Sequence, residues 1–149
     1  MKLKNHLGEI FELRIEKYHT ELSDIEVKLF NSDWLEVKIS IKTKNGIFSK
    51  PLDCFLIEDL ERISDWISGI EHKTTKKKLY FVDSHLVFMR TKRNNVPFIK
   101  VIYYFTESDF VSWDLEINKA NELEFKNKIQ QDLKVYPCRC GMEHNYDKV

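Results

Sequence analysis

The sequence predicts an α+β fold with a mostly antiparallel β-sheet of about six to eight strands and two packed α-helices. Three observations indicate this class. Segments in which apolar and polar residues alternate, as they do in strands, recur along the chain. Apolar residues recur at helical spacing only at Ile57–Ile70 and Lys119–Val135. The connections between neighbouring strand segments are short, which favours antiparallel pairing.

The N-terminal part is predicted to consist of strands, and SDWLEVKISIK, from Ser32 to Lys42, shows the pattern most clearly. From Leu35 onward its apolar side chains alternate with polar ones, which is typical of a strand with one buried face. Asn45-Gly46 follows and fits a type I′ hairpin turn, because both residues tolerate positive φ. Pro51 lacks an N–H, so it puts the return strand at an edge or ends it. The predicted strands are Phe11–Glu16, Ile25–Leu29, Leu35–Thr43 and Ile47–Ser49.

The first predicted helix is Ile57–Ile70, with apolar residues three and four positions apart on one face. Glu58, Asp59 and Glu61 lie in its first turns, where carboxylates complement the helix dipole. Gly69 suits the C′ position, the first residue beyond the helix.

The second predicted helix is Lys119–Val135, and Asn118 before it is a suitable N-cap. Pro137 is expected to stop this helix. Its buried stripe is expected to consist of Phe125, Ile129 and Leu133, with Leu123 beside it.

Between the two helices, His72–Lys78 is expected to form a polar loop with four lysines. Four strands are predicted after it, joined by short turns such as Asp83-Ser84 and Glu107–Asp109. The predicted strands are Leu79–Val82, His85–Thr91, Phe98–Thr106 and Phe110–Ile117. We expect one domain over residues 1–139. Residues 140–149 have little to pack and are expected to form a mobile tail.

Composition excludes several classes of protein. Hydrophobic residues make up 42% of the chain and charged residues 32%, a soluble globular profile. With 24 basic and 24 acidic residues the formal net charge is zero, which argues against a dedicated nucleic-acid binder. Apolar runs such as Val101–Phe105 are too short to span a membrane. The N-terminus does not resemble a signal peptide, and three cysteines do not make a disulfide framework, so a cytoplasmic location is predicted.

No group of residues predicts catalysis, a metal site or a cofactor. Cys138, Cys140 and His144 are possible zinc ligands, but a structural zinc site needs four and only three are local. Cys54 lies among apolar residues, where a thiol is usually inert. Ser84 and His85 are adjacent, but a catalytic triad needs a geometry that adjacency does not supply. We therefore expect no catalytic residues, no metal and no cofactor.

Charged clusters are open to two interpretations. Acidic residues are frequent on the first helix and around the last strands, and most such carboxylates form a solvated face, although an acidic patch can recognise a basic partner. Lysines in Lys73–Lys78 and the cluster at Arg90–Arg93 could bind phosphate. However, no aromatic residue interrupts the lysine run to stack on a base, and no glycine-rich phosphate loop is present.

Three tryptophans have a similar ambiguity. Trp34 falls on the opposite phase from Leu35, Trp66 lies at the edge of the first helix's apolar stripe, and Trp113 stands between Ser112 and Asp114. They either close small satellite cores under loops or include an exposed anchor for a partner, since aromatic residues concentrate the binding energy of interfaces.

A set of motifs resembles the WapI family of bacterial immunity proteins. Ser32-Asp33-Trp34-Leu35 opens the alternating strand, Asn45–Ser49 follows, and Phe55–Leu60 leads into the first helix. Strand segments at Leu79–Val82 and His85–Phe88 come next, and Tyr136–Arg139 closes the pattern with Tyr-Pro-x-Arg. The resemblance covers about Phe11–Arg139.

The resemblance implies a cytoplasmic, non-enzymatic protein that binds the toxic C-terminal domain of a secreted polymorphic toxin and occludes its active site. It identifies no catalytic residues. If the toxin is a nuclease with a basic cleft, acids on the first helix are candidates for contacting it. Glu58, Glu61 and Asp65 are three and four residues apart and share one helical face, and Trp34 is a candidate anchor.

Two alternatives remain at this point. One is an adaptor domain that binds a different protein. The other is a small hydrolase or nuclease that uses dispersed carboxylates. The sequence predicts neither the toxin's identity nor the oligomeric state.

Overall fold

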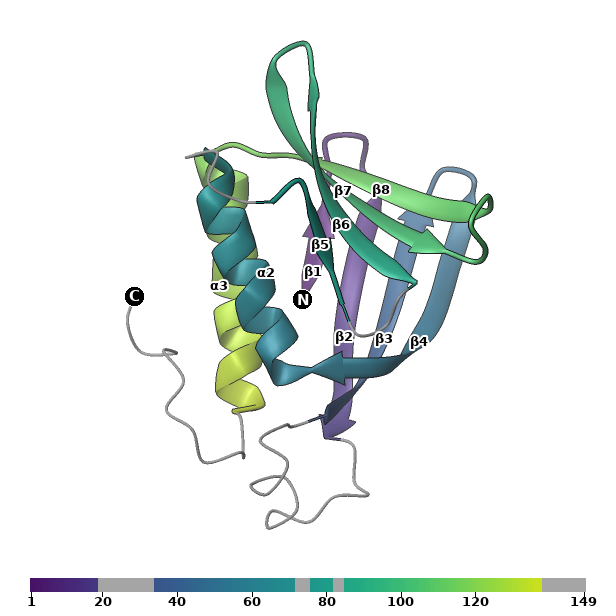
Figure 1. Ribbon diagram of the computed structural model, residues 1–149, viewed down its shortest axis with the longest axis vertical. Helices are drawn as coiled ribbons and strands as arrows, with labels where there is room; N and C mark the ends of the chain where they lie inside the picture. The colour runs from purple at the N-terminus through teal and green to yellow at the C-terminus, as the bar shows by residue number, and fades with distance from the viewer. Residues whose placement is uncertain (19–33, 72–75, 82–84, 138–149) are drawn as a thin grey trace.

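The computed structural model describes residues 1–18, 34–71, 76–81 and 85–137, and these form eight strands and two helices (Figure 1). All strand pairings in this part are antiparallel, which confirms the α+β class. In chain order the elements are β1 (Lys2–Lys4), β2 (Ile10–Tyr18), β3 (Trp34–Thr43), β4 (Gly46–Leu56), α2 (Ile57–Glu71), β5 (Lys78–Tyr80), β6 (Leu86–Arg93), β7 (Val96–Tyr104), β8 (Phe110–Glu116) and α3 (Lys119–Val135).

The eight strands divide into two four-stranded sheets, in the orders β1-β2-β3-β4 and β5-β6-β7-β8. The two helices lie side by side along one end of the sheets (Figure 1). Residue alternation does not reveal this division, because it determines which side chains a strand buries and not which strands pair. Strand β1 was not predicted, since three residues are too few to show a period.

Two hairpin turns differ from expectation. The type I′ turn predicted at Asn45-Gly46 is wrong, because Thr43 pairs with Gly46 and the turn is centred one residue earlier. Of the two predicted turn residues only Gly46 has positive φ, at +146°, and Thr43 Oγ1 accepts the Asn45 N–H at 3.1 Å. Positive φ at two successive residues, as in a type I′ turn, instead occurs at Asn94 (50°) and Asn95 (65°), between β6 and β7.

Strand β4 forms an edge of its sheet, which confirms one of the two roles expected for Pro51. Pro51 pairs in register with Lys38, and the strand continues well past it. The return strand predicted at Ile47–Ser49 is therefore much longer than expected.

Both helices begin where predicted. Helix α3 has the expected bounds, and Asn118 Oδ1 accepts the N–H groups of Ala120 and Asn121 at 3.1 and 3.0 Å. Leu123, expected beside its buried stripe, is 59% exposed. Helix α2 extends to Glu71, so Gly69 lies inside it and the C′ assignment is wrong.

One hydrophobic core joins both sheets and both helices, and Phe88 of β6 lies at its centre. The Phe88 ring contacts Phe11 of β2, Trp66 of α2, Phe81 and Phe125 of α3, with ring centroids 5.3–6.5 Å apart. Because one side chain touches an aromatic ring from one sheet and from each helix, the layers form a single packed unit.

Trp66 and Trp113 belong to this main core and are 5% and 1% exposed, so the idea that they close satellite cores under loops is wrong for these two. Several predictions fall outside the described residues. These are the strand Ile25–Leu29, the Asp83-Ser84 turn, the first part of the lysine-containing loop and the tail at 140–149.

Candidate binding surface

The four residues proposed from the sequence for partner binding lie on or beside α2. Asp65 is exposed, and Glu58 and Glu61 are half-buried. Trp34, also half-buried, is the first residue of β3, and its Cα pairs with Leu56, the residue before α2. The structure therefore brings Trp34 to the N-terminal end of the helix that carries the three acids.

Helix α2 is acidic along its length, with five acidic residues and one basic residue in Ile57–Glu71. The basic residue, Arg62, lies between the candidate acids in sequence. The acidic face is therefore interrupted by a cation, which reduces its negative potential at the centre.

Asp59 differs from the other acids of α2 because it is fully buried. Its Oδ2 accepts the N–H of Leu56 at 3.1 Å, which satisfies a free N–H at the helix start. Its Oδ1 accepts a hydrogen bond from Arg62 Nη1 at 2.7 Å. Burial raises the pKa of Asp59, and the Leu56 N–H and the Arg62 guanidinium act in the opposite direction. Asp59 therefore has a structural role and is not part of the exposed acidic face.

Helix α2 is attached to β5 by two side chains. Arg62 Nη2 donates a hydrogen bond to the carbonyl of Tyr80 at 2.7 Å. About one turn along the same helix, Trp66 Nε1 donates to the carbonyl of Lys76, just before β5, at 2.8 Å. These two bonds place the outer side of the helix next to the segment that carries the lysines.

Lys76, Lys77 and Lys78, here called the lysine row, are held by their main chain while their side chains are exposed. The carbonyl of Lys76 accepts from Trp66, the carbonyl of Lys77 accepts the N–H of Arg90 at 2.8 Å, and Lys78 pairs with Met89 in the sheet. The bond to Arg90 also joins the lysine row to the basic cluster Arg90–Arg93, which is separate from it in the sequence.

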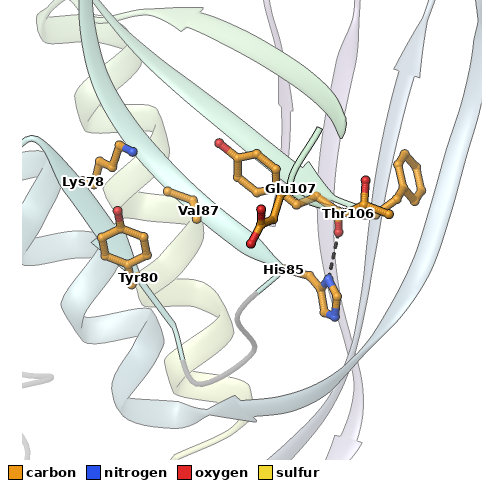
Figure 2. A pocket seen from close by; sticks show the side chains of 8 residues that line it. Lys78, Tyr80, His85, Val87, Thr106 and Glu107 are labelled. Carbon is orange, nitrogen blue, oxygen red and sulfur yellow. Dashed lines mark hydrogen bonds between the residues drawn. The ribbon is translucent and has the colours of Figure 1, made fainter. Parts of the chain in front are cut away.

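A groove of about 710 Å³ lies next to the lysine row on the outer face of the second sheet. Its floor includes Val87, which is 3% exposed, and the side chain of Tyr80 beside it is 55% exposed. Phe105 is 41% exposed, and its ring packs on Phe48 and Tyr103. Figure 2 shows Val87 between Tyr80 on one side and Glu107 on the other. The lining residues are Lys78, Tyr80, His85, Val87, Tyr104, Phe105, Thr106 and Glu107.

Polar groups around the groove are held in place. The Lys78 ammonium lies 6.0 Å from the centroid of the Tyr80 ring. His85 Nδ1 is 2.8 Å from the carbonyl oxygen of Tyr104 (Figure 2). The His85 ring stacks on Tyr103 with centroids 5.7 Å apart. The groove thus combines an exposed aromatic ring and an apolar floor, as the core of a protein interface does, with charged side chains at its edge, as in the polar rim.

Sequence reasoning did not identify this groove. The available signal was that Leu86-Val87-Phe88 are all apolar, although successive side chains of a strand point to opposite faces. In the structure all three are buried. Val87 therefore indicates that the outer face of β6 is also covered. The walls come from β5 and from the residues after β7, and no local pattern predicts that these meet.

The polar face of β3 is occupied by both charge signs, as expected. Glu36 forms an ion pair with Lys17 of β2 at 3.4 Å, and Lys38 is exposed. A smaller hollow of about 300 Å³ lies on this face, between β2, β3 and β4.

Within the described ranges, no three His, Cys, Asp or Glu side chains lie close enough together to hold a metal ion. Cys138, Cys140 and His144 fall outside those ranges, as does Ser84, and the side chain of Cys54 is not described. Asp114, one of the acids of the last strands, is paired with Arg93 and Lys100. No helix in the described part of the chain has the length and apolar character needed to cross a membrane.

Comparison with known proteins gives a match to one family. Residues 2–137 match the model of the Immunity protein WapI-like family. The match begins in β1 and ends after α3, so it includes every element described above. A search of the curated proteins finds no match.

Proposed function

Because the chain belongs to the WapI-like immunity protein family, we propose that it binds and inhibits the toxic C-terminal domain of a secreted polymorphic toxin. The family match over residues 2–137 is the observation that carries this proposal. The protein acts in the cytoplasm of the cell that makes it, and it covers the active site of the toxin without any catalysis of its own.

The structure supports inhibition by occlusion through its rigidity. One core connects both sheets to both helices, so the outer faces of α2 and β5 keep a fixed relation to each other. A preformed surface loses little conformational entropy when it binds, and charged groups on it accelerate association with a partner of complementary charge. Both properties suit a protein that must neutralise a toxin quickly.

For the toxin-binding residues we propose Glu58, Glu61 and Asp65 on α2, with Trp34 beside the start of that helix. If the toxin is a nuclease, its substrate cleft is basic, and these carboxylates take the place of phosphates. Asp65 is the most exposed of the three, so it is expected to contribute most to early steering.

The test is co-expression with the C-terminal domain of the large secreted protein encoded immediately upstream. We expect the wild-type protein to restore growth and to bind that domain directly in purified form. A variant with a charge in the core, Phe88→Glu, is the control that should lose both, because Phe88 is fully buried. Growth arrest despite a folded, abundant wild-type protein would contradict the proposal.

A further inference from the structure

We propose that the lysine row and the adjoining groove form a second part of the toxin-binding surface, and that this part binds an acidic segment of the toxin domain with an apolar side chain seated against the exposed ring of Tyr80. This inference rests on the proposed function and extends it, since for toxin contact the sequence suggested only the acidic face of α2 and Trp34.

The first argument is that the lysine row is preorganised. Trp66, Arg90 and the pairing with β6 hold three successive residues by their main chain. No ion pair with a described residue involves any of the three ammonium groups. Three exposed lysines on a fixed main chain, with charges that no described carboxylate neutralises, match a partner that carries carboxylates.

The groove supplies the second argument. Tyr80 is exposed by about half, whereas Val87, its partner in the sheet, is almost completely buried. An exposed aromatic ring beside an apolar floor is typical of the anchor pocket at the centre of an interface. Because the walls are so open, the groove fits a protruding segment of a protein better than an enclosed small molecule.

The charges around the groove favour a protein over a nucleic acid. Glu107 lies across the groove from Tyr80 (Figure 2), where it would repel a phosphate backbone that follows the lysine row. A polypeptide can place a carboxylate at Lys78 and a hydrogen-bond donor at Glu107, whereas each phosphate of a nucleic acid carries a negative charge.

The two parts of the surface also determine an orientation. Arg62 of α2 is bonded to Tyr80 of β5, so the acidic helix and the lysine row adjoin each other. A toxin that contacts both must present positive charge opposite α2 and negative charge opposite β5. The reversed orientation would bring like charges together, which opposes it.

The experiment measures binding of an inactivated form of the upstream-encoded toxin domain to Lys76→Glu/Lys77→Glu/Lys78→Glu. We expect association at low salt to be slower by about 10-fold or more than for the wild type. Tyr80→Ala, which keeps the carbonyl that Arg62 binds, should instead accelerate dissociation by about 10-fold. The matched control, Lys42→Glu/Lys44→Glu/Lys50→Glu, makes the same charge change at exposed residues of the other sheet and should bind as the wild type does.

Each remaining outcome overturns the inference in a distinct way. If the wild type binds the toxin domain but the lysine-row variant and Tyr80→Ala bind equally well, the inference is wrong and the proposed function stands. If the control variant associates with the toxin domain as slowly as the lysine-row variant does, the total charge of the protein, and not this surface, determines the association rate. A single-stranded oligonucleotide tests the remaining possibility. If the lysine-row variant loses binding to the oligonucleotide but still binds the toxin domain as the wild type does, the row is a nucleic-acid site. If the wild type does not bind the toxin domain at all, the proposed function fails as well.

Discussion

The indole Nε1 of Trp66 donates a hydrogen bond to the main-chain carbonyl of Lys76, 2.8 Å away. Trp66 lies in the core, and the side chain of Lys76 is exposed. This one bond therefore connects the interior of the protein to the start of the lysine row, and it makes the position of a surface cation depend on the packing of α2.

Trp66→Phe should remove that bond and part of the buried ring. We expect the free energy of unfolding to fall by about 1–2 kcal/mol, since the variant loses one hydrogen bond and some apolar contact. In addition, the amides at residues 76–78 should exchange with solvent faster, which hydrogen exchange measures residue by residue.

Trp113→Phe is the matched control for this prediction. Trp113 is 1% exposed, and its Nε1 has no hydrogen-bond partner among the described residues. The control should therefore lose packing without loosening residues 76–78. Equal exchange rates at 76–78 in both variants would show that the Trp66 bond does not hold the lysine row.

Asp59→Asn should change how stability depends on pH. Burial raises the pKa of Asp59 in the folded protein above its ordinary value of 3.8, so the folded state binds this proton more tightly than the unfolded state. The resulting contribution to stability is complete below pH 3.8 and is lost as pH rises through the folded pKa. Urea denaturation across this range should show wild-type stability falling, relative to Asp59→Asn, as pH rises. A difference that stays constant with pH would contradict the raised pKa.

Glu58→Lys/Glu61→Lys/Asp65→Lys should slow association with the toxin domain by about 10-fold or more at low salt, with a smaller effect at high salt. The change at Glu58 also places a cation in the first turn of α2, which costs about 0.3–1 kcal/mol, so folding must be checked by circular dichroism. Asp65→Lys alone avoids this complication because Asp65 lies later in the helix and is exposed.

Glu124→Lys on α3 is the matched control for Asp65→Lys, since Glu124 is exposed and belongs to the other helix. It should leave the association rate unchanged. If Asp65→Lys also binds at the wild-type rate, the acidic face of α2 does not take part in binding.

Asn5→Ala should destabilise the fold by about 2–3 kcal/mol, because it leaves buried polar groups without partners. Asn5 is 6% exposed, and its Oδ1 accepts the N–H groups of Leu7 and Glu9 at 3.0 Å. Its Nδ2 donates to the carbonyl of Asp114, also at 3.0 Å, and so joins the turn after β1 to β8.

Asn5→Asp separates the two contributions at this site. It keeps the acceptor for the Leu7 and Glu9 N–H groups and removes the bonds that Nδ2 donates to the Asp114 carbonyl and to Glu9 Oε2. It is combined with Glu9→Gln, and both are compared with Glu9→Gln alone, so that two carboxylates do not meet. Denaturant titration should place this variant between Glu9→Gln and Asn5→Ala if the bonds accepted by Oδ1 matter. Equal loss of stability in the two Asn5 variants would assign the whole effect to the bonds donated by Nδ2.

The local elements could be read from the sequence because their determinants lie within a few residues of one another. The bounds of α3, its N-cap at Asn118 and the start of α2 follow from apolar spacing and from side chains that bond the nearest free N–H groups. Local signals failed where a neighbouring group had the deciding effect. The hydroxyl of Thr43 bonds the Asn45 N–H, and the turn at this point is not the one predicted at Asn45-Gly46.

The sequence by itself determined the α+β class, both helices, most strands and the acidic character of α2, since periodicity and charge are properties of contiguous residues. Only the tertiary structure decided that the strands form two sheets, that Asp59 is withdrawn from the acidic face and that Lys77 is bonded to Arg90. The groove beside Tyr80 belongs to this second group. Its floor and walls come from segments separated in the chain, and they meet because a single core around Phe88 fixes the helices and sheets against one another.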